Sequence, residues 1–349
     1  MIIEKVSLVN VRKIKQFSET FSPTTTIITG KNGTGKTTIL EAIFFLLTTK
    51  SFRKKYNKSI ITKNQRELQI KGTISPPQRT TIKTTYNGNK KTIYKNNKTI
   101  KKTSELLKYS NIVCVSPEEP DVVETYKQDK IKYFDKIIFK INPKFIKTIK
   151  KYNKLLRIRN NLLENNQETM PWDTQLAKTG IDVWIERKKF FEKIIKQQKQ
   201  TEKTITKTDN YDLKYSQPKT DKIKEYIEQL NTNKTQHKTT FGPHQDNVLI
   251  LIKNNPLQDH GSQGEKKLFR YLLKLAEAEI LYIEKETKPI LLLDDFFAKL
   301  DEENIMKIFT FFHCKFQAII TTTTTKETAM EKLIKKARKT TIKTIKLND

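Results

Sequence analysis

A glycine-rich octapeptide near the N-terminus constrains this chain of 349 residues more than any other feature. Its sequence, GKNGTGKT at 30–37, matches G-x-x-x-x-G-K-[ST] between a predicted strand at 26–29 and a predicted helix at 37–47. In such a loop, backbone N–H groups bind phosphate oxygens, the lysine reaches the β- and γ-phosphates and the hydroxyl binds Mg²⁺. A chance turn is disfavoured because three of the nine glycines fall in six positions. The predicted nucleotide contacts are Gly30, Lys31, Asn32, Gly33, Thr34, Gly35, Lys36, Thr37 and Thr38, with Thr37 as a metal ligand.

The second half of this site is predicted where the unbroken apolar run at 289–293 ends in Asp294 and Asp295. Such a run is typical of a central parallel strand, buried on both faces. Asp294 is expected to hold Mg²⁺, and Asp295 to position or deprotonate an attacking water. Lys36, Asp294 and Asp295 are therefore the candidate catalytic residues. Their separation in the sequence requires a long insertion between strands of one sheet.

A third motif, HGSQGE at 260–265, begins an amphipathic helix and has two interpretations. Ser262 with Glu265 three residues later is the pattern of a capping box. Exposed Ser262 and Gly264 at a helix N-terminus would also suit a second anion site that faces a γ-phosphate. A hydroxyl bonded to its own helix is less free for a ligand, so the roles partly compete. Spacing alone leaves both open.

The hydropathy pattern predicts a split α/β domain with a mostly helical insertion. Asn87-Gly88 predicts a hairpin with a two-residue turn. Apolar stripes at 143–163 and after Met170-Pro171 predict an antiparallel helical hairpin with a packed aromatic core. Residues 197–233 are polar with weak structure signals. The turn 242–247 has no assigned role. Strands are expected at 2–9, 15–21, 26–29, 67–74, 79–86, 90–94, 111–115, 248–252, 289–293 and 316–320, and at a late edge, 340–347.

Charge and composition exclude some classes and leave others open. Lys and Arg outnumber Asp and Glu by 68 to 38, a net charge of +30. Clustered cations favour nucleic acid through counterion release, yet 59 of the 68 are lysines spread over every segment, so a merely lysine-rich surface remains open.

The chain lacks the signals of membrane, secreted and zinc-binding proteins. The longest apolar stretch, 42–47, is too short for a bilayer, and the N-terminus does not have the pattern of a signal peptide. Cys114 and Cys314 match no metal or redox spacing, and neither do His237, His244 and His260. We therefore expect a cytoplasmic protein rather than a membrane protein, a secreted disulfide scaffold or a zinc finger.

Taken in order, the motifs resemble the RecF family of bacterial DNA replication and repair ATPases, which is related to ABC and SMC head domains. The resemblance runs from residue 1 to about 325, and its middle segments are the most specific because general ABC ATPases lack them. It implies an α/β, ABC/SMC-type ATPase head split by an insertion, with a second, mostly α-helical domain. The expected parts are head residues 1–118, helical residues 119–205 and head residues 206–349. The segments that carry the resemblance are SLVNVRKI, LEAIFFLLTTKSFR, VSPEEPD, YNKLLRIRNNLL, WDTQLAKTGIDVWIERKKF, FGPHQDN, GSQGEKKLFRYLLKLAEAE, PILLLDDFFAKLD and QAIITTTT.

The resemblance also implies a mechanism. Two subunits would hold ATP and Mg²⁺ between them in an ATP-dependent homodimer, with slow hydrolysis resetting a clamp on double-stranded DNA at gaps. RecO and RecR would be partners in placing RecA, in recombinational repair and the SOS response to DNA damage. Arg12 matches the family arginine near the nucleotide. The residues implied to act in trans are Ser262, Gln263, Gly264 and Asp301.

Three positions depart from the family pattern, and other functions remain to be weighed. The arginine-rich stretch is KIKYFD at 130–135, Lys267 replaces an arginine, and Gln245 replaces a charged residue. Lysine keeps the charge but loses bidentate phosphate geometry.

Other functions are less well supported by the sequence. A transport-coupled ABC subunit would usually have glutamate at 295, and the helical stripes are too short for an SMC arm. A nucleotide-sensing scaffold, or another SMC/ABC-like ATPase with little direct DNA contact, is the main alternative.

Overall fold

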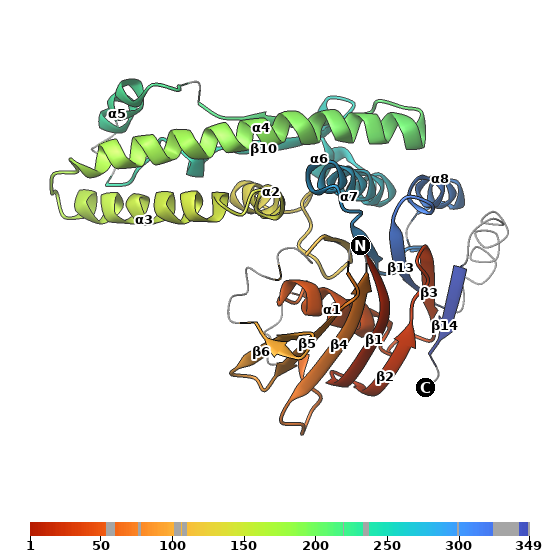
Figure 1. The fold of residues 1–349 in the computed structure, drawn as a ribbon. Helices are drawn as coiled ribbons and strands as arrows, with labels where there is room; N and C mark the ends of the chain where they lie inside the picture. The colour runs from red at the N-terminus through yellow and green to blue at the C-terminus, as the bar shows by residue number, and fades with distance from the viewer. Residues whose placement is uncertain are drawn as a thin grey trace. The chain divides into compact units, whose positions relative to one another are not determined.

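The computed structural model describes residues 1–53, 60–75, 78–100, 106, 110–218, 220–232, 237–298, 300–323 and 342–347. Its contacts divide the chain into two compact units (Figure 1). The first comprises Met1–Asp121, Gln200–Thr208 and Ser262–Asp349, and the second comprises Val122–Lys199 and Asp209–Gly261. Each unit therefore consists of segments that are distant in the sequence.

A parallel sheet forms the centre of the first unit. Its strand order is β14-β3-β13-β12-β8, and every neighbouring pair is parallel. The inner strands are buried along their whole length, as apolar runs in a covered parallel sheet require. The expected late edge strand is confirmed as β14. The strands are β3 (Thr25–Thr29), β8 (Ile112–Val115), β12 (Ile290–Leu293), β13 (Gln317–Thr322) and β14 (Ile342–Lys346).

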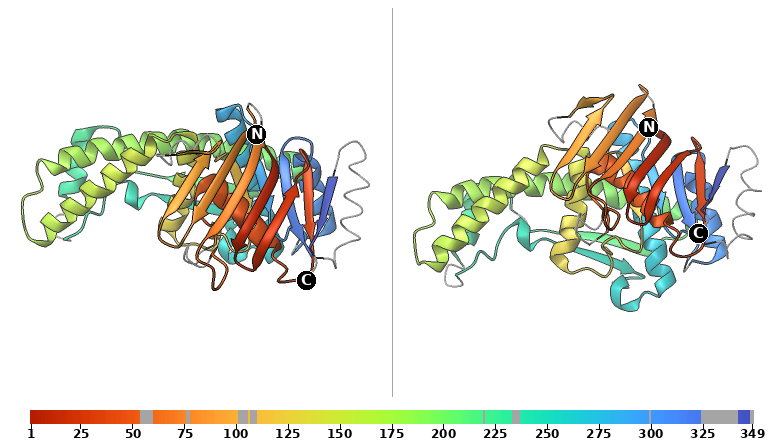
Figure 2. Two further views of the ribbon diagram at one scale, coloured as in Figure 1. Left: turned by 60° about the horizontal axis from the view of Figure 1, so that its bottom comes forward. Right: turned by 90° about the horizontal axis from the view of Figure 1, so that it is seen from below.

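An antiparallel sheet of order β2-β1-β4-β5-β6-β7 completes the strands of this unit (Figure 2). Burial alternates along β4 and β5, as expected for strands with one face on a core. The predicted hairpin is confirmed, but its strands end at Tyr86 and resume at Lys91, so the connection is longer than the predicted Asn87-Gly88 turn. Asn87 N–H donates to the Lys90 carbonyl at 3.3 Å, and Gly88 has φ 87°. The strands are β1 (Ile2–Val11), β2 (Ile14–Thr20), β4 (Leu68–Ser75), β5 (Thr80–Tyr86), β6 (Lys91–Lys95) and β7 (Lys98–Thr99).

Helix α1 (Lys36–Thr48) packs against both sheets. It contacts β1, β4 and β5 of the antiparallel sheet and β8 and β13 of the parallel one. Its apolar side chains join strand residues of both sheets in one hydrophobic core. On the parallel sheet, α7 (Gln263–Lys285) contacts β8 and also α8 (Glu302–Phe312). The loop before α1 is thereby fixed by a well-packed helix.

The second unit contains the predicted helical hairpin. Helices α3 (Phe145–Glu164) and α4 (Trp172–Thr206, in this unit as far as Lys199) run antiparallel (Figure 1). Arg159 of α3 donates to Asp173 of α4 at 2.7 Å, with both side chains buried. The aromatic stripe is core, as predicted: Tyr152, Trp184 and Phe191 are each at most 2 % exposed. Among the described residues, none of the helices has the length and apolarity to span a bilayer.

The longer elements of this unit that were missed in the sequence are α2 (Lys127–Ile141), β9 (Tyr211–Ser216) and α5 (Ile223–Asn231). Helix α5 buries only Tyr226 and Leu230, which is too little for a visible apolar stripe. The weak-signal segment 197–233 therefore contains the end of α4, β9 and α5.

Residues 209–261 pack with the helices, whereas the expected boundaries assigned them to the head. The strand predicted at 248–252 exists as β10 (Asn247–Ile252), but it lies in a small antiparallel sheet between β9 and β11 (Asn255–Pro256). Strand β10 contacts α2, and Asp246 just before it binds side chains of α4. Helix α6 (Leu257–His260) also packs on β10. Because of these contacts, residues 209–261 belong to the helical unit rather than to the head as expected.

The unassigned turn 242–247 is the polar centre of this unit. The buried Asp246 carboxylate accepts hydrogen bonds from Trp184 at 2.8 Å, Arg187 at 2.6 Å and Tyr215 at 2.6 Å. Arg187 also binds Asp135 at 2.9 Å. Because every buried charge has partners, the network meets the condition for a stable buried ion pair.

Gly242 and His244 complete the turn. At Gly242, φ is 137°, and a Cβ atom would lie 2.4 Å from the hydroxyls of Tyr152 and Tyr226. His244 Nδ1 is 2.7 Å from the Tyr152 hydroxyl, and its Nε2 is 2.8 Å from the Thr239 carbonyl. Gln245, the departure from the family pattern, is exposed. The turn therefore has a structural role, and the substitution lies at its surface.

Candidate nucleotide-binding site

The glycine-rich loop lies between the end of β3 at Thr29 and the start of α1 at Lys36. Gly33 and Gly35 have φ angles of 88° and 104°, which residues other than glycine rarely adopt. A Cβ on Gly30 would meet Thr34 Oγ1 at 2.8 Å and the Leu347 carbonyl at 3.0 Å. In the described chain, no side chain caps the start of α1, so its first N–H groups can bind an anion.

Lys36 is folded back on its own loop. Its Nζ donates to the carbonyls of Gly30 and Lys31, both at 2.7 Å. Burial lowers the pKa of the Lys36 ammonium, while Asp295 and Asp294 oppose the shift. The ammonium group is therefore held at the loop beside two carboxylates.

The carboxylate of Asp294 lies at the carboxyl end of β12, where three hydroxyls donate to it. Thr37 and Thr321 donate to Oδ1 at 2.9 and 2.7 Å, and Ser116 donates to Oδ2 at 2.9 Å. Each donor comes from a different element: α1, the end of β13 and the residue after β8. Because β8, β12 and β13 are parallel neighbours, their carboxyl ends meet at one edge. The sheet thus brings together residues distant in the sequence.

Thr37 and Asp294 fit a magnesium ion by their chemistry. The Thr37 hydroxyl commits its proton to Asp294, so the lone pairs of its oxygen can face a cation. Hydroxyl and carboxylate oxygens are the hard ligands that Mg²⁺ prefers. The two predicted metal ligands are adjacent in the structure.

Asp295 has an unusual backbone. Its φ is 50°, in the left-handed region, and its N–H donates to Thr321 Oγ1 at 2.9 Å. Its side chain lines the same cavity as Lys36 and Thr37. The structure thus brings all three candidate catalytic residues, Lys36, Asp294 and Asp295, to one place.

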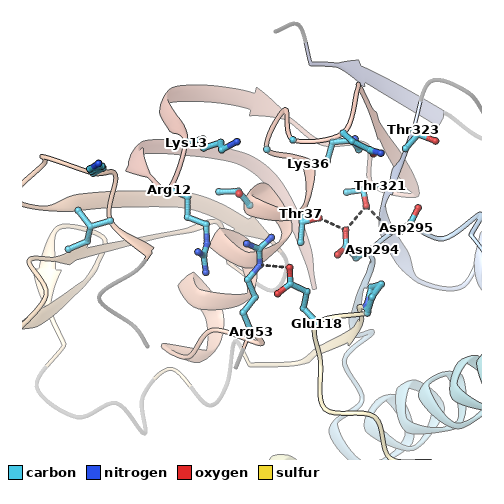
Figure 3. Close-up of a pocket in the computed structure, with 17 residues that line it drawn as sticks. Arg12, Lys13, Lys36, Thr37, Arg53, Glu118, Asp294, Asp295, Thr321 and Thr323 are labelled. Atoms are coloured by element: carbon cyan, nitrogen blue, oxygen red, sulfur yellow. Dashed lines mark hydrogen bonds and ion pairs between the residues drawn. The ribbon is translucent and has the colours of Figure 1, made fainter. Parts of the chain in front are cut away.

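A cavity of about 630 Å³ opens over these residues (Figure 3). This volume lies in the range of sites for small ligands and cofactors. Three carboxylates, those of Asp294, Asp295 and Glu118, face a larger set of cations, which suits a polyanionic ligand. The cationic residues lining it are Arg12, Lys13, Lys36, Arg53 and Lys63.

Arg12 belongs to this cavity and is held by a buried carboxylate that the sequence analysis did not single out. Glu41 of α1 is fully buried and accepts from Arg12 Nε at 2.5 Å and from Ser51 Oγ at 2.5 Å. Arg53 Nε lies 3.4 Å from Glu41. The signal available was a lone glutamate within the apolar helix 37–47. Ser116 and Thr321 were also missed, although each directly follows an apolar run of the sequence, as Asp294 does.

The residues implied to act in trans do not line the cavity. Ser262 forms both halves of the capping box, since its Oγ accepts from Glu265 N–H at 3.2 Å and its N–H donates to Glu265 Oε2 at 2.8 Å. Gln263, like Ser262, is exposed. Asp301 caps α8 by accepting from the N–H of Asn304 at 2.7 Å. Within one chain, both motifs are helix caps.

Lys267, the departure in the third motif, contacts the segment after the paired aspartates. Its Nζ donates to the carbonyls of Asp295, at 3.2 Å, and of Ala298. Backbone carbonyls need one donor rather than a bidentate fork, so lysine suffices for this contact.

Comparisons with known proteins show the family of this chain. The family described as "RecF/RecN/SMC N terminal domain" matches residues 2–345. The DNA replication and repair protein RecF of Alkaliphilus oremlandii is 32% identical, covering 87% of this chain and 88% of the relative. That of Clostridioides difficile is 31% identical, with 86% of each covered.

Solved structures give the same picture. The recombination mediator protein RecF-ATP of the RecFOR pathway has TM-score 0.79 and 27% identity, over 92% of each chain. An Smc head domain from Pyrococcus furiosus has TM-score 0.54 and 17% identity, over 95% of this chain and 91% of that one. This likeness confirms the predicted ABC/SMC-type fold. With a family match along nearly the whole chain and curated relatives above 30% identity, the chain belongs to the RecF family of DNA replication and repair proteins.

Proposed function

We propose that this protein is a RecF-type, ATP-dependent DNA-binding protein of replication and recombinational repair. The observation that carries the proposal is the meeting of Thr37, Asp294 and Thr321 beside the glycine-rich loop, in a cavity rich in cations. ATP would place its phosphates on residues 30–38, with Thr37 and Asp294 holding Mg²⁺. The metal neutralises charge on the phosphates during transfer.

The residues of the chain divide the remaining work. Lys36 exchanges the carbonyls of Gly30 and Lys31 for β- and γ-phosphate oxygens. Asp295, whose side chain lines the cavity, accepts a proton from the attacking water. Arg12, held by Glu41, adds positive charge near the ligand. With these roles, the protein would hydrolyse ATP slowly, and hydrolysis would reset its clamp on double-stranded DNA.

The trans site is compatible with the observed cap. Ser262 Oγ accepts from Glu265 N–H, so its own hydroxyl proton remains available for a γ-phosphate oxygen. The N–H groups of Gln263 and Gly264, in the first turn of α7, have no intrahelical acceptor. Ser262, Gln263, Gly264 and Asp301 of one subunit would close the site of another, as an ATP-dependent homodimer requires.

The proposed partners are double-stranded and gapped DNA, with RecO and RecR acting in the placement of RecA. The relatives are named as DNA replication and repair proteins, and one solved relative is described as part of the RecFOR pathway. The net charge of +30 favours DNA.

Binding of duplex and gapped DNA across a salt series tests this function. We expect tighter binding with ATP than with ADP or no nucleotide. Lys36→Ala should abolish this ATP effect and ATP-dependent dimerisation, because the variant lacks the phosphate contact. Lys222→Ala, at an exposed lysine paired with Glu225, is the control. If ATP leaves the DNA affinity of the parent unchanged, the nucleotide-sensing scaffold is the better description.

A further inference from the structure

Thr321 contacts both paired aspartates through one hydroxyl. Its Oγ1 donates to Asp294 Oδ1 at 2.7 Å and accepts the N–H of Asp295 at 2.9 Å. The residue is 1 % exposed, and a hydroxyl offers one proton and two lone pairs, enough for both bonds. Figure 3 shows it beside Asp294 and Asp295, at the inner wall of the cavity.

Strand register explains why Thr321 occupies this place. Leu293 of β12 lies opposite Ile320 of β13 in the parallel ladder, so the next residues, Asp294 and Thr321, are neighbours. The Thr321 carbonyl also accepts the N–H of Phe296 at 3.3 Å. One residue therefore holds the segment 294–296 at three points.

The backbone of Asp295 needs such support. A φ of 50° is sterically disfavoured for a residue with a Cβ, and such conformations persist where their surroundings over-determine them. The bond from Asp295 N–H to Thr321 Oγ1 is a specific restraint on this backbone. The direction of the Asp295 side chain follows from its backbone.

The other two hydroxyls that donate to Asp294 make different contacts. Ser116 donates only to Oδ2 of Asp294, and Thr37 is the predicted metal ligand. Thr321 alone among the three also binds the backbone of Asp295. Its loss would leave the Asp294 carboxylate with two donors and the Asp295 N–H without its acceptor.

We propose that Thr321 is a positioning residue that couples the two aspartates, orienting the Asp294 carboxylate for the metal and directing the Asp295 side chain into the cavity. The inference rests on the proposed ATPase function and deepens it. It assigns Thr321 no contact with the nucleotide, so nucleotide affinity and turnover should separate when its hydroxyl is removed.

The test compares Thr321→Val, which keeps the shape and loses the hydroxyl, with Thr321→Ser, which keeps it. Thr322→Val is the matched control, since Thr322 is equally buried on the same strand and its hydroxyl donates to the Thr323 carbonyl rather than to the paired aspartates. The measurements are single-turnover ATP hydrolysis, the affinity for a fluorescent ATP analogue in Mg²⁺ and in EDTA, and the unfolding midpoint.

We expect Thr321→Val to slow hydrolysis about 10- to 100-fold, the usual effect of losing a partner of a metal ligand. Thr321→Val should also raise the Mg²⁺ concentration at which the affinity for the ATP analogue reaches half of its maximum. The affinity for the analogue in EDTA should stay unchanged. Thr321→Ser should keep the hydrolysis rate and the Mg²⁺ dependence of the parent protein. Should Thr321→Val not fold, Thr321→Cys, which retains a weak donor, is expected to show the same separation more mildly.

Two failures are distinguishable. A parent protein that does not bind the ATP analogue refutes the proposed function, and the inference that rests on it. If the parent binds and hydrolyses ATP while Thr321→Val matches Thr322→Val in rate and Mg²⁺ dependence, the role of Thr321 alone is overturned.

Discussion

The carboxylate of Glu41 binds the guanidinium of Arg12 at 2.5 and 2.8 Å, at the wall of the nucleotide cavity. Glu41 lies on α1, directly after the glycine-rich loop, and Arg12 lies on the turn between β1 and β2. An ion pair with a buried carboxylate therefore connects the antiparallel sheet to the helix that follows the phosphate-binding loop.

Glu41→Gln should destabilise the protein by about 1–3 kcal/mol, because the partly exposed Arg12 guanidinium loses its counter-charge and the charge-assisted hydrogen bonds to it. The affinity for ATP should fall as well, since Arg12 lines the cavity. Chemical denaturation and nucleotide titration measure the two effects. Glu4→Gln is the control, because Glu4 pairs with the exposed Arg79 and should lose at most about 1 kcal/mol. Equal losses of stability in Glu41→Gln and Glu4→Gln would contradict the proposed role of the Glu41–Arg12 ion pair.

Asp295→Asn should bind ATP and hydrolyse it about 10²- to 10⁴-fold more slowly, the range for loss of a general base. The amide keeps the size of the side chain but cannot accept the proton from water. Single-turnover hydrolysis and nucleotide affinity give the two readings. Glu118→Gln removes another carboxylate of the same cavity and should change the rate less. Unchanged turnover in Asp295→Asn would remove this residue as the base.

Stability should decrease as the pH falls below about 6.5. Burial lowers the pKa of His244, and burial also lowers that of His313. The unfolded chain therefore binds more protons than the folded protein in this range, and the stability gained from each neutral histidine is lost as the pH falls. One such group contributes a slope of at most about 1.4 kcal/mol per pH unit.

His244→Gln should make this slope shallower, and denaturation between about pH 7 and 5 measures it. His260→Gln, at an exposed position, is the control. An identical slope in His244→Gln and in the parent would show that the buried histidine does not set the pH dependence.

Removal of residues 342–349 should weaken ATP binding. Strand β14 pairs with β3, which leads into the glycine-rich loop, and Leu347 N–H donates to the Thr29 carbonyl at 2.8 Å. The truncation removes this support from Gly30 without deleting a proposed ligand. Lys343→Ala, which loses only the contacts to Glu19 and Thr20, should have a smaller effect. Equal nucleotide affinity in the truncated and parent proteins would contradict the proposed support.

The parts of the fold predicted correctly are those with strong local signals. The loop 30–37 has an unmistakable spacing, 289–293 is a continuous apolar run, and α3 and α4 carry long apolar stripes. Helix α5 and strand β9 were missed because short, polar elements gain their stability from packing against neighbours rather than from their own pattern.

The role of the turn 242–247 illustrates the same division. Its residues Gly242, His244 and Asp246 have no chemical pattern that points to a ligand, and their partners lie on α3, α4 and β9. Only the folded unit shows that the turn satisfies a buried polar network.

The sequence by itself determined the loop at 30–37, the paired aspartates and the helical hairpin, because spacing and periodicity are properties of neighbouring residues. Tertiary structure decided which other side chains join them. Ser116, Thr321 and Glu41 have meaning only after parallel strands align their carboxyl ends and α1 packs between two sheets. Ser116 and Asp294 are 178 positions apart, and even Thr321 is 27 positions from Asp294. A buried carboxylate can retain its charge only where such partners converge, and local sequence patterns do not show where they meet.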